Sequence, residues 1–304
     1  MRVVTRKRHF SAFRSASARG EFGPALEPGT LPSFFKPIGL DFIVTPSGRV
    51  VLVELNHGFG RRGLISLFPK ISVQYRRAYW DLRREHGKSM EIIEGVREIC
   101  SNKYTTYELL SRFQPASRVF RGWTAKTEAW LESLESDYIL AKPFRGCCGD
   151  GILVFDRREF IRARGEVELG HANLLQEYVT SRMLPGSDGR LHIGCIRHIM
   201  MIISDGEALS FTHMPSYWRV SPTPYVDRAD MEALTADISR GAEPLAVDEE
   251  DAVKVRAQAN EVCTALVEHI LGLEGVPLGP SAVLTPDEVG EPALLPEPME
   301  SCDL

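Results

Sequence analysis

One lysine followed by closely spaced glycines is the feature of this chain best suited to phosphate chemistry. Lys142 ends the apolar run 138–141, and three glycines come soon after it: Gly146, Gly149 and Gly151. Glycines so close together let backbone N–H groups approach a phosphate without interference from a Cβ atom. The apolar runs 138–141 and 152–155 predict two strands with this glycine loop between them. Such a loop can cover a polyphosphate.

A second polar group lies on a predicted hairpin nearer the N-terminus. Residues 38–44 and 49–56 are apolar and β-branched and are joined by a turn with proline and glycine, which predicts two antiparallel strands. Asp41 lies in the first strand, and Glu54 and Asn56 project from one face at the end of the second. Two carboxylates and an amide oxygen are ligands suited to Mg²⁺. A solvated rim of a surface hairpin explains the same spacing, and both interpretations stay open.

Two further predicted strands carry polar residues. Residues 174–179 carry two adjacent polar residues, Gln176 and Glu177, at a strand end. Backbone groups at such a position can contact the edge of an adenine, although an edge strand with solvated side chains has the same pattern. Residues 191–203 form an apolar run interrupted by Arg197, and a charge there is costly unless it is paired or faces a polar cleft. Contact with a phosphate is the preferred interpretation of Arg197 over a structural ion pair. Three histidines are interpreted as strand or core residues: His192, His198 and His213.

The remaining pattern predicts mostly helices. The mixture of aromatic residues and arginines at 72–88 predicts a helix on a partner surface, and helices are also expected at 89–100, 102–113 and 124–134. Residues 208–220 predict one strand. The longest helix is expected at 248–271, with a stripe at helical spacing formed by Val253, Ala257, Val262, Ala265, Leu266 and Ile270.

Composition places the chain among ordinary globular proteins. Its 304 residues are 43% hydrophobic and 25% charged, with a net charge of −5. The acidic balance argues against bulk binding of nucleic acid, and no run of eighteen apolar residues predicts a membrane span. The six cysteines contain no C-x-x-C pair, so free thiols in a reducing cytoplasm are expected.

Taken in order, these motifs resemble the ATP-grasp superfamily over roughly residues 90–300. Residues 102–110, followed by Pro115, are similar to the family's opening helix, in which Lys103 would reach a nucleotide phosphate. Lys142 and its glycines resemble the second lysine and the flexible loop. Arg197 stands where the family often places an arginine on the transferred phosphate. The last motif resembles the family's hinge, which holds adenine, and consists of Gln176, Glu177, Tyr178 and Val179.

The metal motif departs from the family's usual pattern. The family usually ends with an Asp strand and then Glu-x-Asn, whereas here Asp41, Glu54 and Asn56 stand near the N-terminus, with the spacing of D-alanine–D-alanine ligase-like members. At the expected place, residues 279–286 echo residues 39–46, with Ser281 in place of the aspartate, and the chain goes on to Glu297 and Met299. Either a circular permutation lets the N-terminal hairpin complete the site, or the later copy binds metal through Glu297. The first account is preferred because its ligand set is complete.

The resemblance implies an α+β, ATP-grasp fold in which two α/β subdomains clamp ATP. The expected parts are a flexible basic arm at 1–37, a hairpin and helix region at 38–88, and subdomains at 89–180 and 181–304. The implied activity is a cytoplasmic, ADP-forming ligase of the carboxylate–amine or carboxylate–thiol type. It would use ATP and Mg²⁺ to join a small-molecule carboxylate to an amine through an acyl phosphate. No nucleic-acid or membrane partner is expected. The alternatives are a non-catalytic nucleotide-binding protein and a phosphotransferase of the same fold.

Overall fold

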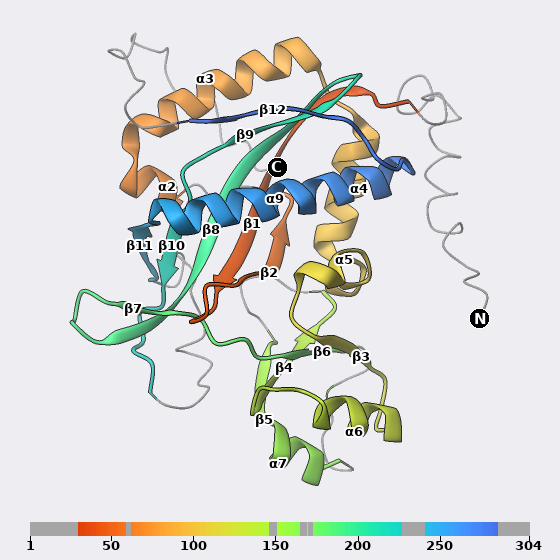
Figure 1. Ribbon diagram of the computed structural model, residues 1–304, viewed down its shortest axis with the longest axis vertical. Helices are drawn as coiled ribbons and strands as arrows, with labels where there is room; N and C mark the ends of the chain where they lie inside the picture. Colours follow the sequence, from red (N-terminus) through yellow and green to blue (C-terminus); the bar gives the residue numbers. More distant parts are fainter. Residues whose placement is uncertain are drawn as a thin grey trace.

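The computed structural model describes residues 30–58, 62–145, 151–164, 169, 173–226 and 241–284. These residues form two sheets with helices packed against them, a mixed α/β arrangement with mostly antiparallel strands (Figure 1). The glycines Gly146 and Gly149 and the acidic residue Glu297 lie outside the described residues. No helix in the described ranges is both long and apolar enough to cross a membrane.

The larger sheet has eight strands within the described residues, with β8 at its centre. One side of β8 pairs with β1, which pairs in turn with β2, and the other side pairs with β9 and β10. All of these pairs are antiparallel, whereas β12 joins β9 in parallel. The bounds are β1 Ser33–Val44, β2 Val50–Asn56, β7 Met183–Pro185, β8 Leu191–Asp205, β9 Leu209–His213, β10 Tyr217–Val220, β11 Glu243–Ala246 and β12 Leu278–Val283.

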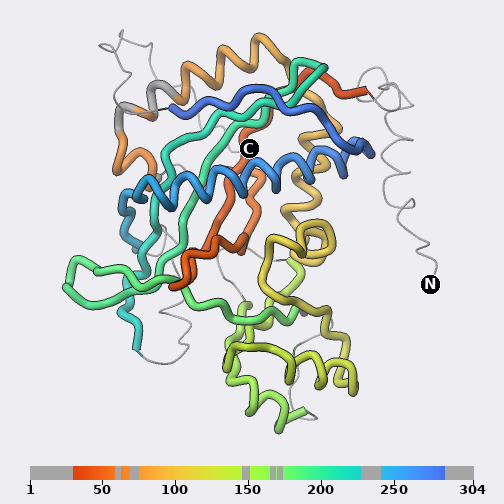
Figure 2. The backbone as a smooth tube through the Cα atoms, viewed as in Figure 1, coloured from red at the N-terminus to blue at the C-terminus, as the bar shows by residue number. Residues whose placement is uncertain are grey.

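The smaller sheet has four antiparallel strands in the order β3-β6-β4-β5. Its strands are β3 Ser117–Phe120, β4 Tyr138–Pro143, β5 Leu153–Asp156 and β6 Asn173–Glu177, and the helices α6 Ala125–Glu132 and α7 Arg157–Arg162 lie with it. A separate apolar cluster that includes Phe120, Leu131, Ile139 and Phe160 packs between this sheet and its helices. Figure 2 shows this part of the chain, in yellow and green, as a distinct body below the large sheet.

Helices cover both faces of the large sheet. α4 (Met90–Ser101), α5 (Lys103–Leu110) and α9 (Glu249–Leu271) pack over the main core. α2 (Arg62–Leu67) and α3 (Pro69–His86) pack over a second core on the other face. The 3₁₀ turn η1 (Ser111–Phe113) follows α5. Each helix lies within a residue range that the sequence predicted to be helical or extends it by a few residues, except α2 and α7.

The predicted hairpin is present, and its first strand is longer than expected. β1 begins at Ser33, so residues 33–37 belong to the sheet and not to an arm, because Phe34 and Phe35 are buried in the two cores. Gly48 closes the turn with a φ of +80°, a conformation that favours glycine. Residues 1–29 lie outside the described residues.

Two details of the prediction are wrong. Residues 208–220 form two strands, because Pro215 between β9 and β10 has no N–H for a sheet hydrogen bond. The stripe on α9 is wrong only in its first two members: Val253 is 51% exposed and Ala257 is exposed, whereas Val255 is fully buried. The buried face of α9 also contains Ala252, Ala259, Val262, Cys263, Leu266, Val267, Ile270 and Leu271.

The three histidines are core residues, as predicted. His198 and His213 lie on neighbouring strands, with Nε2 of His198 2.9 Å from Nδ1 of His213. Nδ1 of His198 also lies 2.8 Å from the Ser216 hydroxyl. Burial is the main reason that the pKa of His198 lies well below its ordinary value and that of His213 is lowered to about 4. Both rings are therefore neutral in the folded protein near pH 7.

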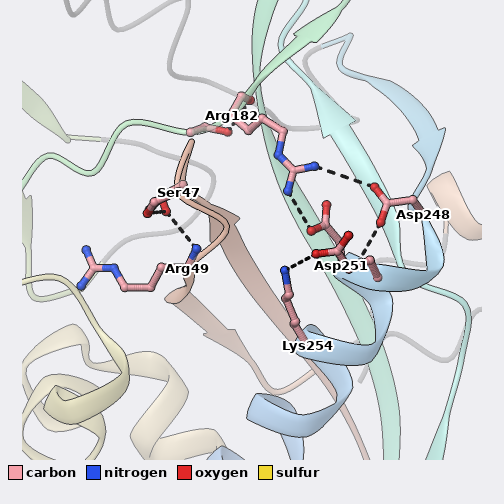
Figure 3. Close-up of polar contacts among 9 residues, drawn as sticks. Ser47, Arg49, Arg182, Asp248, Asp251 and Lys254 are labelled. Atoms are coloured by element: carbon pink, nitrogen blue, oxygen red, sulfur yellow. Dashed lines mark hydrogen bonds and ion pairs between the residues drawn. The ribbon is translucent and has the colours of Figure 1, made fainter.

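The linker that leads from the small sheet into the large one is anchored at Arg182. Its backbone N–H donates to the Val44 carbonyl at 2.7 Å. Its guanidinium donates to Asp251 at 2.8 Å and lies 3.8 Å from Asp248, both at the start of α9 (Figure 3). This attachment fixes the end of β6 relative to the β1–β2 turn, and so places the two sheets around the polar residues that lie between them.

Candidate functional site

A small polar cavity lies where the two sheets and the α4–α5 junction meet. Its volume is about 20 Å³, room for roughly one water molecule. Two lysines, one carboxylate and two amides reach it from five separate parts of the chain. The lining residues are Val53, Glu54, Leu55, Cys100, Lys103, Thr106, Gln114, Lys142, Leu174 and Gln176.

Lys142 is held inside the small sheet by an amide on the neighbouring strand. Its Nζ donates to Oε1 of Gln176 at 2.6 Å, and Nε2 of Gln176 donates to the Ser117 hydroxyl at 2.9 Å. Burial lowers the pKa of Lys142 to about 8, an effect that Glu54 opposes and Lys103 reinforces. A buried ammonium with one fixed hydrogen bond retains two N–H donors that can turn toward an anion.

Lys103 reaches the same cavity from the first turn of α5. Asn102 caps this helix, its side chain accepting a hydrogen bond from the Tyr104 N–H at 3.0 Å. The backbone N–H of Lys103 donates to the Phe144 carbonyl at 2.8 Å, just beyond β4. The start of α5 is thereby tied to the strand that carries Lys142, and this explains why residues 39 positions apart in sequence share one cavity.

Glu54 is the carboxylate of the cavity. It lies directly across the hairpin from Asp41 in the β1–β2 register. Burial and then the Asp41 charge raise the pKa of Glu54, while Lys103, Lys142 and Arg219 act in the opposite direction. Glu54 therefore stands between a second carboxylate and the two lysines, in a place where its protonation responds to any ion that enters.

Asp41 is fully buried and is already bound by two arginines. Arg197 donates through Nε to Oδ1 and through Nη2 to Oδ2, the latter at 2.8 Å, and Nη2 of Arg219 lies 2.9 Å from Oδ2. The Asn56 amide also donates to Oδ2 at 3.3 Å. Burial alone would raise the pKa of Asp41, but the two guanidinium groups outweigh it and hold the pKa below its ordinary value. The arrangement is a buried ion cluster that links β1, β8 and β10.

The charges around the cavity do not cancel. Two carboxylates, Asp41 and Glu54, face four cationic groups, which are Lys103, Lys142, Arg197 and Arg219. The excess of two positive charges lies in a region shielded from water, where electrostatic attraction is several times stronger than in bulk solvent. The described residues of the site are therefore complementary to an anion.

The residues proposed as metal ligands come together only in part. Asp41, Glu54 and Asn56 do meet at one end of the hairpin, but both oxygens of Asp41 accept hydrogen bonds from Arg197. The described residues contain no group of three or more His, Cys, Asp or Glu that could hold a metal ion. The echo at residues 279–284 lies in and just after β12, which is separated from β1 by β9 and β8. Ser281 therefore does not occupy a position equivalent to that of Asp41.

The predicted adenine hinge has one side chain that is used elsewhere. Oε1 of Glu177 accepts the backbone N–H groups of Glu135 and Ser136 at 2.9 and 3.1 Å. The Tyr178 N–H donates to the Tyr138 carbonyl at 3.2 Å, so this part of the backbone closes the small sheet. Val179 follows in an irregular segment. In the glycine loop, Gly151 precedes β5 and has a φ of +72°.

Several residues of the cavity were not expected from the sequence. Gln114 contributes a buried Oε1 with no hydrogen-bond partner in the described structure, and Cys100 and Thr106 line the same space. Arg219 contacts Asp41 and the Cys195 sulfur, the latter at 3.0 Å. A polar residue directly before Pro115, where a helix ends next to a strand, is the one sequence signal that marks Gln114.

Comparison with known proteins gives little beyond this geometry. No family model matches the chain, and no curated protein matches it. Among solved structures, the chain is similar to one named "Putative gamma-glutamylcysteine synthetase" from Methylobacillus flagellatus KT. The two share 12% sequence identity with a TM-score of 0.39, over 86% of this chain and 91% of that one. A likeness this low shows neither the fold nor the activity of this chain.

Proposed function

We propose that the protein is an ATP-dependent ligase of the ATP-grasp type, which joins a carboxylate to an amine and releases ADP. The observation that carries this proposal is the cavity in which Lys103, Lys142 and Glu54 converge from three separate elements. The excess positive charge around it favours a polyphosphate over a neutral ligand. In this proposal the N-terminal hairpin completes the site, as in a circularly permuted chain, because β1 and β2 lie beside β8 and against the cavity.

Each lysine has a role that follows from its surroundings. Lys103 and Lys142 bind phosphate oxygens of the nucleotide, and Gln176 orients the Lys142 ammonium through its 2.6 Å hydrogen bond. Transfer of a phosphoryl group needs charge stabilisation more than covalent help from the protein. The acyl phosphate that forms on the substrate carboxylate is then attacked by the amine. Closure of the small sheet over the bound intermediate would exclude water and protect it from hydrolysis.

The proposed enzyme would use Mg²⁺, held by fewer protein ligands than the sequence indicated. Asp41 does not fit as a ligand in the observed arrangement, because its oxygens are bound by Arg197 and Arg219. Glu54 fits, since its carboxylate lines the cavity and its pKa is raised by burial and by the neighbouring Asp41 charge, both of which a cation would offset. Bound there with the nucleotide, the ion would supply neutralisation of phosphate charge. Arg197 has a positioning role here, through Asp41, in place of direct contact with phosphate.

The size of the cavity sets a condition on binding. About 20 Å³ does not hold a triphosphate, so the small sheet must move away from the β1–β2 hairpin when nucleotide enters. Adenine would bind at the backbone of Tyr178 and Val179, beside the linker that Arg182 anchors. Glu177 would act there through its backbone, because its side chain holds the turn at Glu135.

The experiment is a comparison of ATP affinity and ADP release among three lysine variants. Lys103→Ala and Lys142→Ala should each weaken ATP binding at least ten-fold by calorimetry, because each removes one charged contact worth roughly 1.5–3 kcal/mol. Lys126→Ala, on the exposed start of α6, is the matched control and should bind like the native protein. ATP affinity that is unchanged by Lys142→Ala would sink the assignment. ADP release on mixing with sets of carboxylic acids and amines then tests the ligase activity.

One observation favours a second candidate, a nucleotide-binding protein without ligase chemistry. Asp41 is bound by two guanidinium groups, so the full ligand set for two metal ions is not available as arranged. Such a protein would bind ATP through the same lysines and release no ADP with any acid or amine. The two candidates are therefore separated by turnover and not by binding.

A further inference from the structure

The outward face of α3 is rich in arginine and carries an exposed tryptophan. Ile71 and Tyr75 are buried against the large sheet, whereas Arg76, Arg77 and Arg84 are exposed on the helix surface. Trp80 is 40% exposed, and the Arg83 guanidinium lies over its ring, 5.0 Å from the centroid. This combination is a surface able to bind anions, and neither the proposed nucleotide site nor the cores use it.

The charge of this surface contrasts with that of the chain as a whole. Residues 69–88 contain six basic and two acidic residues, a local net charge of +4, in a chain whose net charge is −5. Arg84 pairs with Asp81, but Arg76 and Arg77 form no ion pair within the described ranges. We call the residues Arg76, Arg77, Trp80, Arg83 and Arg84 the basic face of α3.

An acidic segment of the same chain begins next to this helix. Residues 285–304 contain six acidic residues and no lysine or arginine; the acids are Asp287, Glu288, Glu291, Glu297, Glu300 and Asp303. The described chain reaches Leu284, which packs against the apolar cluster that contains Ile71 and Tyr75 of α3. Figure 1 draws β12, which leads to Leu284, along the same edge of the molecule as α3.

We propose that the basic face of α3 is the docking surface of the acidic segment 287–303 of the same chain. Extended chain spans about 3.3 Å per residue and helix about 1.5 Å, so nineteen residues beyond Leu284 can cover the full length of α3. The connection also gives the segment a local concentration of the order of millimolar, which a separate partner does not have. Docking there would hold Glu297 beside α3 and away from the cavity. Glu54 would then be the acidic residue that lines the cavity.

Two other occupants fit the observations less well. A membrane surface would need an apolar face on α3, and that face is buried against the second core. A nucleic acid would be repelled by the rest of the chain, because the net charge outside residues 69–88 is strongly negative. Individual exposed ion pairs contribute about 0–1 kcal/mol and are screened by salt, so docking needs several pairs at once and should be salt-sensitive.

The test uses the full chain labelled with 5-fluorotryptophan and read by fluorine NMR. The four tryptophans give four signals, and Trp80→Phe assigns one of them. Replacing the six acids of 287–303 by their amides should shift the Trp80 signal and leave the other three in place. Arg76→Gln with Arg77→Gln should produce a similar shift, and adding the amides to that variant should produce no more. Glu249→Gln with Glu250→Gln, at exposed positions on α9, is the control and should shift nothing at Trp80.

A cross-link identifies the occupant directly. In an Arg77→Lys variant, a carbodiimide should couple residue 77 to a carboxylate of 287–303 within one molecule, and 1 M salt should abolish the product. The proposal would be overturned if the Trp80 signal did not shift when all six acids were replaced. It would also be overturned if the carbodiimide cross-link formed only between two molecules. An oligonucleotide that moves the Trp80 signal of the native chain at micromolar concentration, as strongly as in the amide variant, would assign the surface to nucleic acid instead.

Discussion

Replacing Asp41 by asparagine tests the buried ion cluster at the base of the candidate site. The change keeps the size of the side chain but leaves Arg197 and Arg219 with no carboxylate, and both guanidinium groups are almost entirely removed from solvent. Removing one partner of a buried ion pair costs about 3–5 kcal/mol, and the retained amide oxygen argues for the lower end. For a chain of 304 residues, about 3 kcal/mol corresponds to a fall in melting temperature of roughly 5 °C.

The assay is urea unfolding followed by circular dichroism at pH 7, with Asp81→Asn as the matched control. That control breaks the exposed pair with Arg84 and should cost less than about 1 kcal/mol. Because the pKa of Asp41 lies below its ordinary value, the contribution of its carboxylate should persist until the pH falls below about 4. A loss for Asp41→Asn no larger than that of the control would refute the reasoning. It would mean that Arg197 and Arg219 do not pair with Asp41 when the protein is in solution, and that the Asp41 carboxylate is available to bind Mg²⁺.

Three other predictions address the lysine, the histidines and the long helix. Lys142 has a pKa of about 8, so ATP affinity should fall about ten-fold between pH 7 and pH 9 as the ammonium loses its proton, and calorimetry on Lys142→Gln should show no such fall. Burial lowers the pKa values of His198 and His213, so the unfolded chain binds more protons than the folded chain below about pH 6.5. The free energy of unfolding should therefore be about 2 kcal/mol lower per histidine at pH 5 than at pH 7. In His213→Asn, the part of this pH dependence that comes from His213 should disappear. Val255→Ala should destabilise the fold by about 1–3 kcal/mol in urea while Val253→Ala changes it by less than about 0.5, and equal effects would contradict the burial of this helix.

The elements of the site were predictable because each has a strong local signal. The β-branched runs on either side of a Pro/Gly turn gave the hairpin, and the helix expected at 102–113 corresponds to α5. The apolar run ending in Lys142 gave β4, whereas Gln176 was expected only as part of an adenine hinge and not as the partner of Lys142 on the neighbouring strand. The convergence of these residues in one cavity depends on how the strands pair, which the local pattern around each residue does not indicate.

The partners of the charged residues were less predictable, because pairing across a sheet depends on long-range register. Arg197 and Asp41 are 156 residues apart, and nothing local in either strand indicates that β1 and β8 are neighbours. The charge inside β8 was correctly seen as needing a partner, but a phosphate and a carboxylate satisfy it equally well. Val253 was misplaced for a similar reason: periodicity gives the spacing of a buried stripe, but only packing against the sheet decides which stripe is buried.

The distance along the chain between β1 and β8 has a consequence for synthesis. Chains are made at about 5–20 residues per second, so roughly 8–30 seconds pass between the emergence of Asp41 and that of Arg197. During that interval the β1–β2 hairpin has no neighbour on the β8 side, and its apolar residues Leu40 and Phe42 have no core to enter. An unpaired strand of this kind is a site for association with other chains. The protein should therefore depend on chaperones during translation more than a chain of the same composition whose central strands are made one after another.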